Sequence, residues 1–182
     1  MEEFLKKFRS YLLLIGIAGL IVALDQWTKA IVRSNLAIGE TWMPLESLAS
    51  FVRVVHWHNT GAAFGIFPGA SIIFTIIAFA VAIGIILLYP TLAGEALVMR
   101  LSVALMLGGA LGNLVSRLLV GSVTDFISVG TFPVFNVADS CITVGTGILI
   151  AAMWIEERQR PKAEPGSTEA AAQDVEEAQE VD

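Results

Sequence analysis

The sequence is poor in the side chains from which many soluble enzymes build their sites: one cysteine and two histidines occur among 182 residues. A single cysteine, Cys141, excludes an intramolecular disulfide, and with no second cysteine at metal-ligand spacing it indicates no zinc site. We expect Cys141 to fill apolar space in a helix. His56 and His58 have no nearby carboxylate or cysteine pattern, so we interpret them as loop or membrane-interface residues rather than metal ligands.

Charge is also scarce. Charged residues make up 15% of the chain and hydrophobic residues 55%, and the mean hydropathy is +0.74. Because a soluble domain is typically about 25% charged, this composition indicates an integral membrane protein. The formal charge of −6 comes from residues 156–182, since acidic and basic residues balance in 1–155. The segment 156–182 lacks aromatic residues, and we predict a disordered cytoplasmic tail without chemistry of its own.

Four apolar stretches each approach the roughly 20 residues that a helix needs to cross about 30 Å of hydrocarbon. They lie at about 11–33, 68–89, 97–120 and 137–155. The expected fold is all-α and membrane-integral, with four transmembrane helices and a small β-containing extracytoplasmic region after the first. Residues 1–155 are interpreted as one four-span domain. Glycines recur in the third and fourth stretches, where we expect close helix packing.

Lysine and arginine near the ends of these stretches predict the orientation. Seven lie on the side of the two termini: Lys6, Lys7, Arg9, Arg100, Arg158, Arg160 and Lys162. Four lie on the other side: Lys29, Arg33, Arg53 and Arg117. Of these, we expect Lys29 and Arg117 to be buried. We therefore predict that both termini are cytoplasmic. The N-terminal stretch resembles a signal peptide, but it lacks an A-x-A-like cleavage site and is interrupted by Asp25, so we expect a retained helix.

The longest connection, residues 34–67, follows the first stretch. Within it, residues 51–57 are rich in β-branched and aromatic side chains, which predicts short strands. Trp27, Trp42 and Trp57 on this side suit an aromatic belt at the membrane interface. The connection is well placed to cover a bound substrate.

Polar residues of the four stretches gather near the outer face of the membrane. At about 1.5 Å per residue, Asp25 lies about 21 Å beyond Tyr11, and Lys29 follows one turn later on the same helix face. Other segments bring further polar residues to this level: Asn59, Asn113, Arg117, Asp125, Asn136 and Asp139. Ionisable side chains inside a membrane are costly and usually mark function.

Each of these residues also has a purely structural interpretation. Asp25 and Lys29 form an i,i+4 pair that would fix the end of a helix, and Arg117 would extend to the interface. The fourth stretch begins with Asn and Asp residues of the kind that cap a helix N-terminus. Asp125 would be a loop residue. Both interpretations stay open at this point.

Carboxylates are the remaining candidates for catalytic side chains. The chain lacks a G-x-S-x-G elbow, an H-E-x-x-H helix and a phosphate-binding glycine-rich loop. Asp125 and Asp139 flank a short outer connection and can approach each other. Two carboxyls at one site cannot both ionise comfortably, and such a pair supplies a base for water and an acid for a carbonyl, as in aspartic proteases. The residues thus suggest an aspartate-dependent protease, and they leave open a proton-coupled transporter or a non-catalytic assembly factor.

Four sequence blocks within residues 10–155 carry a resemblance to a known family. They are residues 25–29 (DQWTK), 59–65 (NTGAAFG), 108–117 (GGALGNLVSR), and 123–126 (VTDF) together with 135–140 (FNVADS). Four blocks in this order, at matching places relative to four spans, are highly specific. The chain resembles the lipoprotein signal peptidases, also called the signal peptidase II family.

The resemblance implies an aspartyl endopeptidase of the bacterial inner membrane. Members of that family remove the signal peptide of diacylglyceryl-modified prolipoproteins, cutting before the lipidated cysteine. The resemblance implies that Asp125 and Asp139 are catalytic and that Asp25 and Lys29 support the fold and the site. It further implies four residues that bind substrate or shape the site: Asn59, Asn113, Arg117 and Asn136.

No metal or organic cofactor is implied by the resemblance. The partners we expect are diacylglyceryl prolipoproteins and membrane lipid, with no nucleic acid, and we expect a functional monomer. Ser116 departs from the family, which often has an acidic residue before the arginine. This leaves open how Arg117 is paired locally.

Overall fold

The computed structural model describes residues 1–43, 47, 51–61, 69–93 and 96–159. In this part of the chain the elements follow the order α1 (Glu2–Asn35), β1 (Thr41–Trp42), β2 (Val52–Asn59), α2 (Ser71–Ala93), α3 (Leu97–Val120), β3 (Val123–Val129) and α4 (Val137–Gln159). All four helices are long and apolar enough to cross a membrane. The predicted fold of four spanning helices with a small sheet is confirmed.

The chain divides into two compact units, Met1–Ile150 and Ala151–Asp182, and the first contains every candidate site residue. The predicted boundary at residue 155 stays a prediction. The tail that we predict to be disordered consists mostly of residues 160–182, which lie outside the described residues. Part of the connection that we predict to cover substrate, residues 44–46, 48–50 and 62–67, also lies outside them.

Helix α3 lies against both α1 and α2 and is the most buried of the four helices. Its glycines allow this close packing. An added Cβ at Gly108 would lie 2.7 Å from Cβ of Ile21, and one at Gly112 would lie 2.8 Å from Oδ2 of Asp25. The expected packing role of the glycines is therefore present on α3, where a larger residue would displace α1.

Gly109→Ala tests this packing beside α4. A Cβ at Gly109 would fall on the carbonyl oxygen of Ala138 and 2.7 Å from Cγ1 of Ile142, so α4 would have to move. We expect a loss of about 1–3 kcal/mol, as in an overpacked core, read as a lower Tm in detergent. Gly84→Ala is the control, because nothing lies within 4 Å of its Cβ position. Equal Tm values for the two variants would contradict the prediction.

Helix α2 contains a proline that its neighbour accommodates. Pro90 has no N–H, so it cannot donate to the carbonyl of Ile86, one helical turn earlier. The Tyr11 hydroxyl lies 3.4 Å from that carbonyl oxygen. The adjacent Tyr89 hydroxyl donates to the Ser10 carbonyl at 3.0 Å. Freed backbone groups in apolar surroundings need such partners, and these contacts join α1 to α2.

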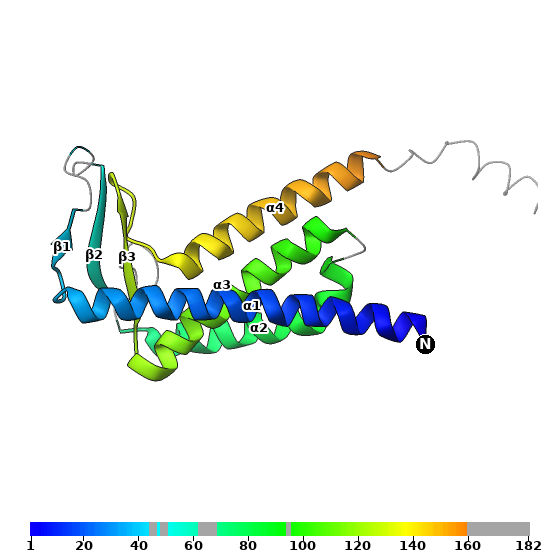
Figure 1. The fold of residues 1–182 in the computed structure, drawn as a ribbon, viewed down its shortest axis with the longest axis horizontal. Coiled ribbons are helices and arrows are strands. Elements are labelled where there is room, and N and C mark those ends of the chain that lie inside the picture. The colour runs from blue at the N-terminus through cyan, green and yellow to red at the C-terminus, as the bar shows by residue number, and fades with distance from the viewer. Residues whose placement is uncertain (44–46, 48–50, 62–68, 94–95, 160–182) are drawn as a thin grey trace, which may run out of the picture. The chain divides into compact units, whose positions relative to one another are not determined.

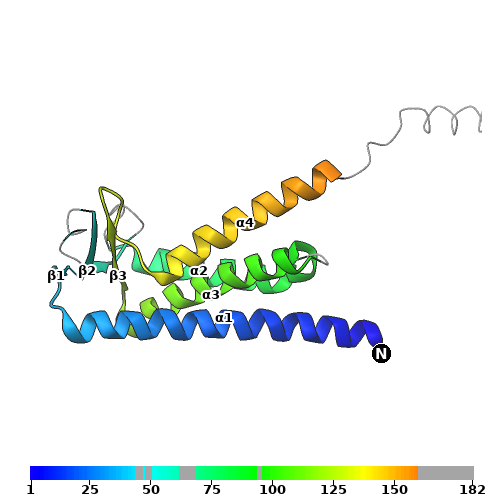
Figure 2. The same ribbon diagram turned by 45° about the horizontal axis from the view of Figure 1, so that its top comes forward.

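The three strands form an antiparallel sheet in the order β1-β2-β3. Figure 1 shows this sheet at the C-terminal end of α1, near the first turn of α4, and Figure 2 shows the N-terminus at the opposite end of α1. Strand β2 confirms the strand predicted near residues 51–57. Strand β3 was not predicted: the connection that carries Asp125 is a strand, and its sequence VTDFISV has the β-branched and aromatic character that indicates one.

The end of α1 is joined to the sheet by two side-chain hydrogen bonds. Nδ1 of His56 donates to the Leu36 carbonyl at 2.8 Å, and Arg33 donates to the Thr124 hydroxyl at 3.2 Å. His58 also lies on β2, with its Nε2 2.5 Å from the Ser122 hydroxyl. The histidines were interpreted as loop or membrane-interface residues; both belong to a strand, so the loop interpretation was wrong, and the interface location stays a prediction.

Candidate active site

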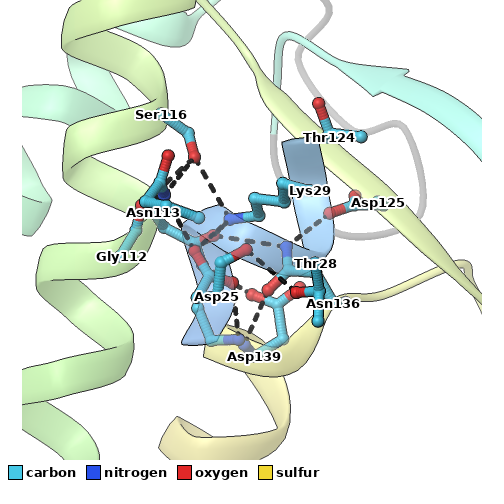
Figure 3. A network of polar contacts seen from close by, with 12 residues as sticks. Asp25, Thr28, Lys29, Gly112, Asn113, Ser116, Thr124, Asp125, Asn136 and Asp139 are labelled. Atoms are coloured by element: carbon cyan, nitrogen blue, oxygen red, sulfur yellow. Dashed lines mark hydrogen bonds and ion pairs between the residues drawn. The ribbon is translucent and has the colours of Figure 1, made fainter. Parts of the chain in front are cut away.

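Seven of the eight residues singled out in the sequence form one hydrogen-bonded cluster, drawn in part in Figure 3. Its side chains come from α1, β2, β3, α3 and α4, together with the residue just before α4. They are Asp25, Lys29, Asn59, Asn113, Asp125, Asn136 and Asp139. The eighth residue, Arg117, lines the same cavity as the two candidate catalytic aspartates.

Asp125 is positioned by the register of the sheet. It pairs with Trp57 across β2 and β3, so Asn59, two residues beyond Trp57, lies on the same face as Asp125. Asn59 Nδ2 donates to Asp125 Oδ2 at 2.8 Å. The other oxygen, Oδ1, accepts from Asn136 Nδ2 at 2.6 Å. Both oxygens of this carboxyl are therefore held by amide donors.

A bulge in β2 makes this register possible. Between the pairs Val54–Ile127 and Trp57–Asp125, two residues of β2 oppose one residue of β3. Because side chains alternate between faces, a shift by one residue exchanges the two faces of a strand. Without the bulge, Asn59 would point away from Asp125. Bulges often re-aim side chains in this way beside functional sites.

Asp139 is held by the cap of α4. Asn136 Oδ1 accepts from the Asp139 N–H at 3.0 Å, and Asp139 Oδ2 accepts from the Asn136 N–H at 3.2 Å. This reciprocal pair is a capping box with asparagine and aspartate in place of the usual residues. Asp139 Oδ1 accepts from Asn113 Nδ2 at 2.7 Å. The capping considered as the structural alternative is present, and it fixes the carboxylate at the site.

Asp25 and Lys29 form an ion pair of 2.8 Å, and both side chains are fully buried. The pair does more than stabilise α1. Asp25 Oδ1 accepts from the Ala138 N–H at 3.0 Å, which caps α4 with a carboxylate from α1. The Lys29 ammonium also donates to Asn113 Oδ1 at 2.9 Å and to the Ser116 hydroxyl at 3.2 Å. All three of its N–H donors are thus used.

Lys29 determines which way the neighbouring amides face. An ammonium can only donate, so Asn113 must turn its Oδ1 toward Lys29 and its Nδ2 toward Asp139. Asn136 Nδ2 then donates both to Asn113 Oδ1 at 3.2 Å and to Asp125. We call Asn113 and Asn136 the amide relay. Through it, each carboxylate receives an amide N–H rather than a carbonyl oxygen.

The surroundings of Asp125 make its carboxyl easier to protonate than an exposed aspartate. Its side chain is 2% exposed. Burial, followed by the nearby charge of Asp139, raises the pKa of Asp125 to about 6, against the opposing effect of hydrogen bonds from Asn59 and Asn136. Two neighbouring carboxyls that can exchange a proton near neutral pH are the arrangement that acid–base catalysis by aspartates requires.

A cavity of about 590 Å³ opens onto both aspartates. Its polar lining includes Asn59 and Asn113, and much of the rest is apolar, including Phe74 and Val144. The Arg117 guanidinium lies over the Phe74 ring, 5.8 Å from its centroid. Its Nε is buried and has no hydrogen-bond partner among the described residues. Arg117 therefore lines the cavity and has one donor that no described residue uses.

In the described part of the chain, no group of three or more His, Cys, Asp or Glu residues could hold a metal ion. The side chains that surround the cavity offer carboxylate acid–base chemistry and amide hydrogen bonds. Two members of the network were missed from the sequence, Gln26 and Ser116. Helical spacing was the available signal, since Ser116 follows Asn113 by three residues.

A sequence model of the family described as Signal peptidase (SPase) II matches residues 17–155. This chain belongs to the signal peptidase II family. Two relatives called lipoprotein signal peptidase are similar over most of their length. The protein of Halalkalibacterium halodurans is 42% identical over 150 residues, which cover 80% of this chain and 94% of the relative. That of Desulfitobacterium hafniense is 39% identical over 147 residues, covering 80% and 95%.

Solved structures agree with this signal peptidase II fold. A bacterial membrane enzyme solved at 2.3 Å resolution is 33% identical, with a TM-score of 0.75 over 83% of this chain and 93% of that one. Another, at 1.9 Å, is 35% identical, with a TM-score of 0.69 over 77% and 91%. The predicted family, enzyme class and fold are confirmed. The chain is a membrane-embedded peptidase of a bacterial family, and the alternative of a proton-coupled transporter is not favoured.

Proposed function

We propose that this signal peptidase II removes signal peptides from diacylglyceryl prolipoproteins of the bacterial inner membrane, cutting before the lipidated cysteine with Asp125 and Asp139 as its catalytic pair. One observation carries the proposal. The buried carboxyl of Asp125 and the half-buried carboxyl of Asp139 come from different elements and line one cavity, and both accept hydrogen bonds from Asn136. The names of the relatives support prolipoprotein substrates.

The two aspartates take different roles. Asp139, the more exposed of the two carboxyls, acts as the base that takes a proton from water. Asp125 carries a proton and gives it to the oxygen of the scissile carbonyl as the water oxygen bonds to the carbon. When the C–N bond breaks, the leaving amine takes the proton held by Asp139, and the new carboxyl group returns a proton to Asp125. Asp125 is then protonated and Asp139 ionised, as before the reaction.

The other residues orient the substrate and the pair. Arg117 is assigned to a substrate carbonyl oxygen, because it lines the cavity beside the two aspartates and its guanidinium can only donate. Asn59, Asn113 and Asn136 hold the two carboxyls. Such positioning is a large part of what an enzyme contributes to a reaction. Asp25 and the lysine paired with it support the site from α1.

The arrangement of the helices supports a site at the outer leaflet. The cluster lies where α1 and α3 end and α4 begins, at the opposite end of α1 from the N-terminus (Figures 1 and 2). The lysines and arginines near the termini favour a cytoplasmic location for both chain ends. A lipid-anchored substrate would then meet the site without leaving the membrane. One chain supplies every proposed site residue, which is consistent with a functional monomer.

The decisive experiment uses purified protein and a defined prolipoprotein peptide. We expect the diacylglyceryl-modified precursor to be cut on the N-terminal side of its cysteine, as read by mass spectrometry, and the same precursor without lipid to be cut far more slowly. Cleavage at another bond, or equal rates for the two precursors, would overturn the proposed substrate. Proton flux in reconstituted vesicles without cleavage would favour the transporter instead.

The raised pKa of Asp125 predicts the alkaline side of the pH profile. A catalytic acid with a pKa of about 6 loses its proton as the pH rises, so kcat/KM should fall through an apparent pKa of about 6 in the free enzyme. Bound substrate excludes water from the site and raises the pKa of Asp125 further. The alkaline fall of kcat should therefore lie at higher pH than the alkaline fall of kcat/KM. If the activity falls only below about pH 4, near the ordinary pKa of aspartate, and stays constant at higher pH, this role for Asp125 is contradicted.

A further inference from the structure

We propose that Gln26 and Ser116 are positioning residues of the peptidase: they hold the Lys29 ammonium so that the amide relay keeps its N–H groups on the two aspartates. This inference rests on the proposed function and adds two residues to it. Neither residue lines the cavity, and the hydrogen bonds of both lead to Lys29 and its ion-pair partner rather than to the catalytic pair. Both therefore act through Lys29.

The Ser116 hydroxyl is used completely (Figure 3). It donates to the Gly112 carbonyl at 3.2 Å and accepts from Lys29 Nζ at 3.2 Å and from Gln26 Nε2 at 3.0 Å. One donor and two acceptor sites are all that a hydroxyl has. Ser116 is fully buried, so water is not at hand to replace a lost partner.

Gln26 fixes this hydroxyl from the opposite helix. Its Nε2 lies 2.9 Å from Asp25 Oδ2, 2.9 Å from the Gly112 carbonyl and 3.0 Å from the Ser116 hydroxyl. Asp25 Oδ2 and the Gly112 carbonyl can only accept, so the amide nitrogen must face them, and its two N–H groups are shared among the three contacts. The contacts with Gly112 and Ser116 join α1 to α3 beside Lys29.

The third hydrogen bond of Lys29 decides where its ammonium sits. The ammonium is held by three acceptors from two helices, Asp25 on α1 and Asn113 and Ser116 on α3. Without the hydroxyl, one buried N–H loses its acceptor, which is costly in a low-dielectric setting. The ammonium would then shift to find another acceptor, and the Asn113 amide that donates to Asp139 would shift with it.

The test is the cleavage assay on two shape-conserving variants, Ser116→Ala and Gln26→Met, and on their combination. Because a small displacement of a catalytic group is enough to slow a reaction strongly, we expect each single variant to lower kcat by about tenfold and to leave KM within about twofold. Both act on one ammonium, so the double variant should lose about as much as either single variant, as coupled residues do.

Ser102→Ala is the matched control. Ser102 is also a buried serine of α3 that donates to the carbonyl four residues earlier, at 2.6 Å from Val98, and this hydrogen bond lies outside the network. We expect an unchanged kcat. The Tm of each variant in detergent is measured in parallel, and if one variant does not fold, the other serves as the test.

The inference would be overturned by an unchanged kcat in the folded variants, by an equal loss of kcat in Ser102→Ala, or by a double variant whose loss is the product of the two single losses. A raised KM with an unchanged kcat would also overturn it, since it would indicate a role in substrate binding rather than in positioning. These outcomes are distinct from failure of the proposed function. In that case the wild-type protein itself would not cleave the lipidated precursor.

Discussion

Asp139→Asn is expected to lower the rate of prolipoprotein cleavage by at least about a thousandfold, the scale seen when a member of a catalytic unit is removed. An amide cannot take a proton from water, and it offers one acceptor oxygen where the carboxylate offers two. Asn113 Nδ2 and the Asn136 N–H both donate to Asp139, so one of them loses its acceptor. We expect a modest loss of stability, about 1–3 kcal/mol for an unsatisfied buried donor.

Asp125→Asn belongs to the same test and should be as inactive, because the pair works as a unit and its losses are not additive. The double variant should be no slower than either single one. Glu40→Gln is the control, as an exposed carboxyl near the sheet whose contact with the Ala37 N–H an amide oxygen can keep. Retained cleavage in a folded Asp139→Asn or Asp125→Asn protein would overturn the assignment of the catalytic pair.

Lys29→Met is expected to have the next largest effect. It leaves the fully buried Asp25 carboxylate without its cation, and breaking a buried ion pair in this way costs about 3–5 kcal/mol. It also removes the donor that orients Asn113, so activity should fall along with the Tm. The measurement is the Tm in detergent together with the cleavage rate at a temperature at which the variant is folded.

A second variant separates the two consequences of that change. Asp25→Leu/Lys29→Met removes both charges, and replacing a buried pair by apolar residues is often nearly neutral for stability. Because the Ala138 N–H also loses its Asp25 acceptor, we expect the double variant to regain only part of the Tm lost in Lys29→Met. The activity should not return, because Asn113 remains free to turn. Recovery of both would show that the ion pair serves stability alone and that Lys29 does not orient the amide relay for catalysis.

Several polar residues of the site satisfy both interpretations that the sequence left open. Asn136 and Asp139 cap α4, and that cap aims the Asp139 carboxylate. Asp25 and Lys29 form the i,i+4 pair of a helix, and the same pair reaches α4 and Asn113. In a membrane, a buried polar group needs a partner whether or not it is functional. A site built from capping and ion-paired groups meets both requirements with the same atoms.

Hydropathy and spacing by themselves determined much of this protein. Four stretches of adequate length predict four spanning helices, and a constant rise per residue places Asp25, Lys29 and Asn113 near one membrane level. The motif blocks around Asp125 and Asp139 led to the correct family. These signals are local, because the hydrocarbon thickness and the helical rise act on each segment separately.

Only the tertiary structure decided which polar atoms near this membrane level form hydrogen bonds with one another. Asp25 caps an N–H that lies 113 positions away in the sequence, and the bulge in β2 selects the face on which Asn59 meets Asp125. The roles of Gln26 and Ser116 also appear only when α1 packs on α3. Hydrogen bonds depend on distances of a few tenths of an ångström and on direction. Such distances are set by how separate helices pack, and no periodicity within one segment contains them.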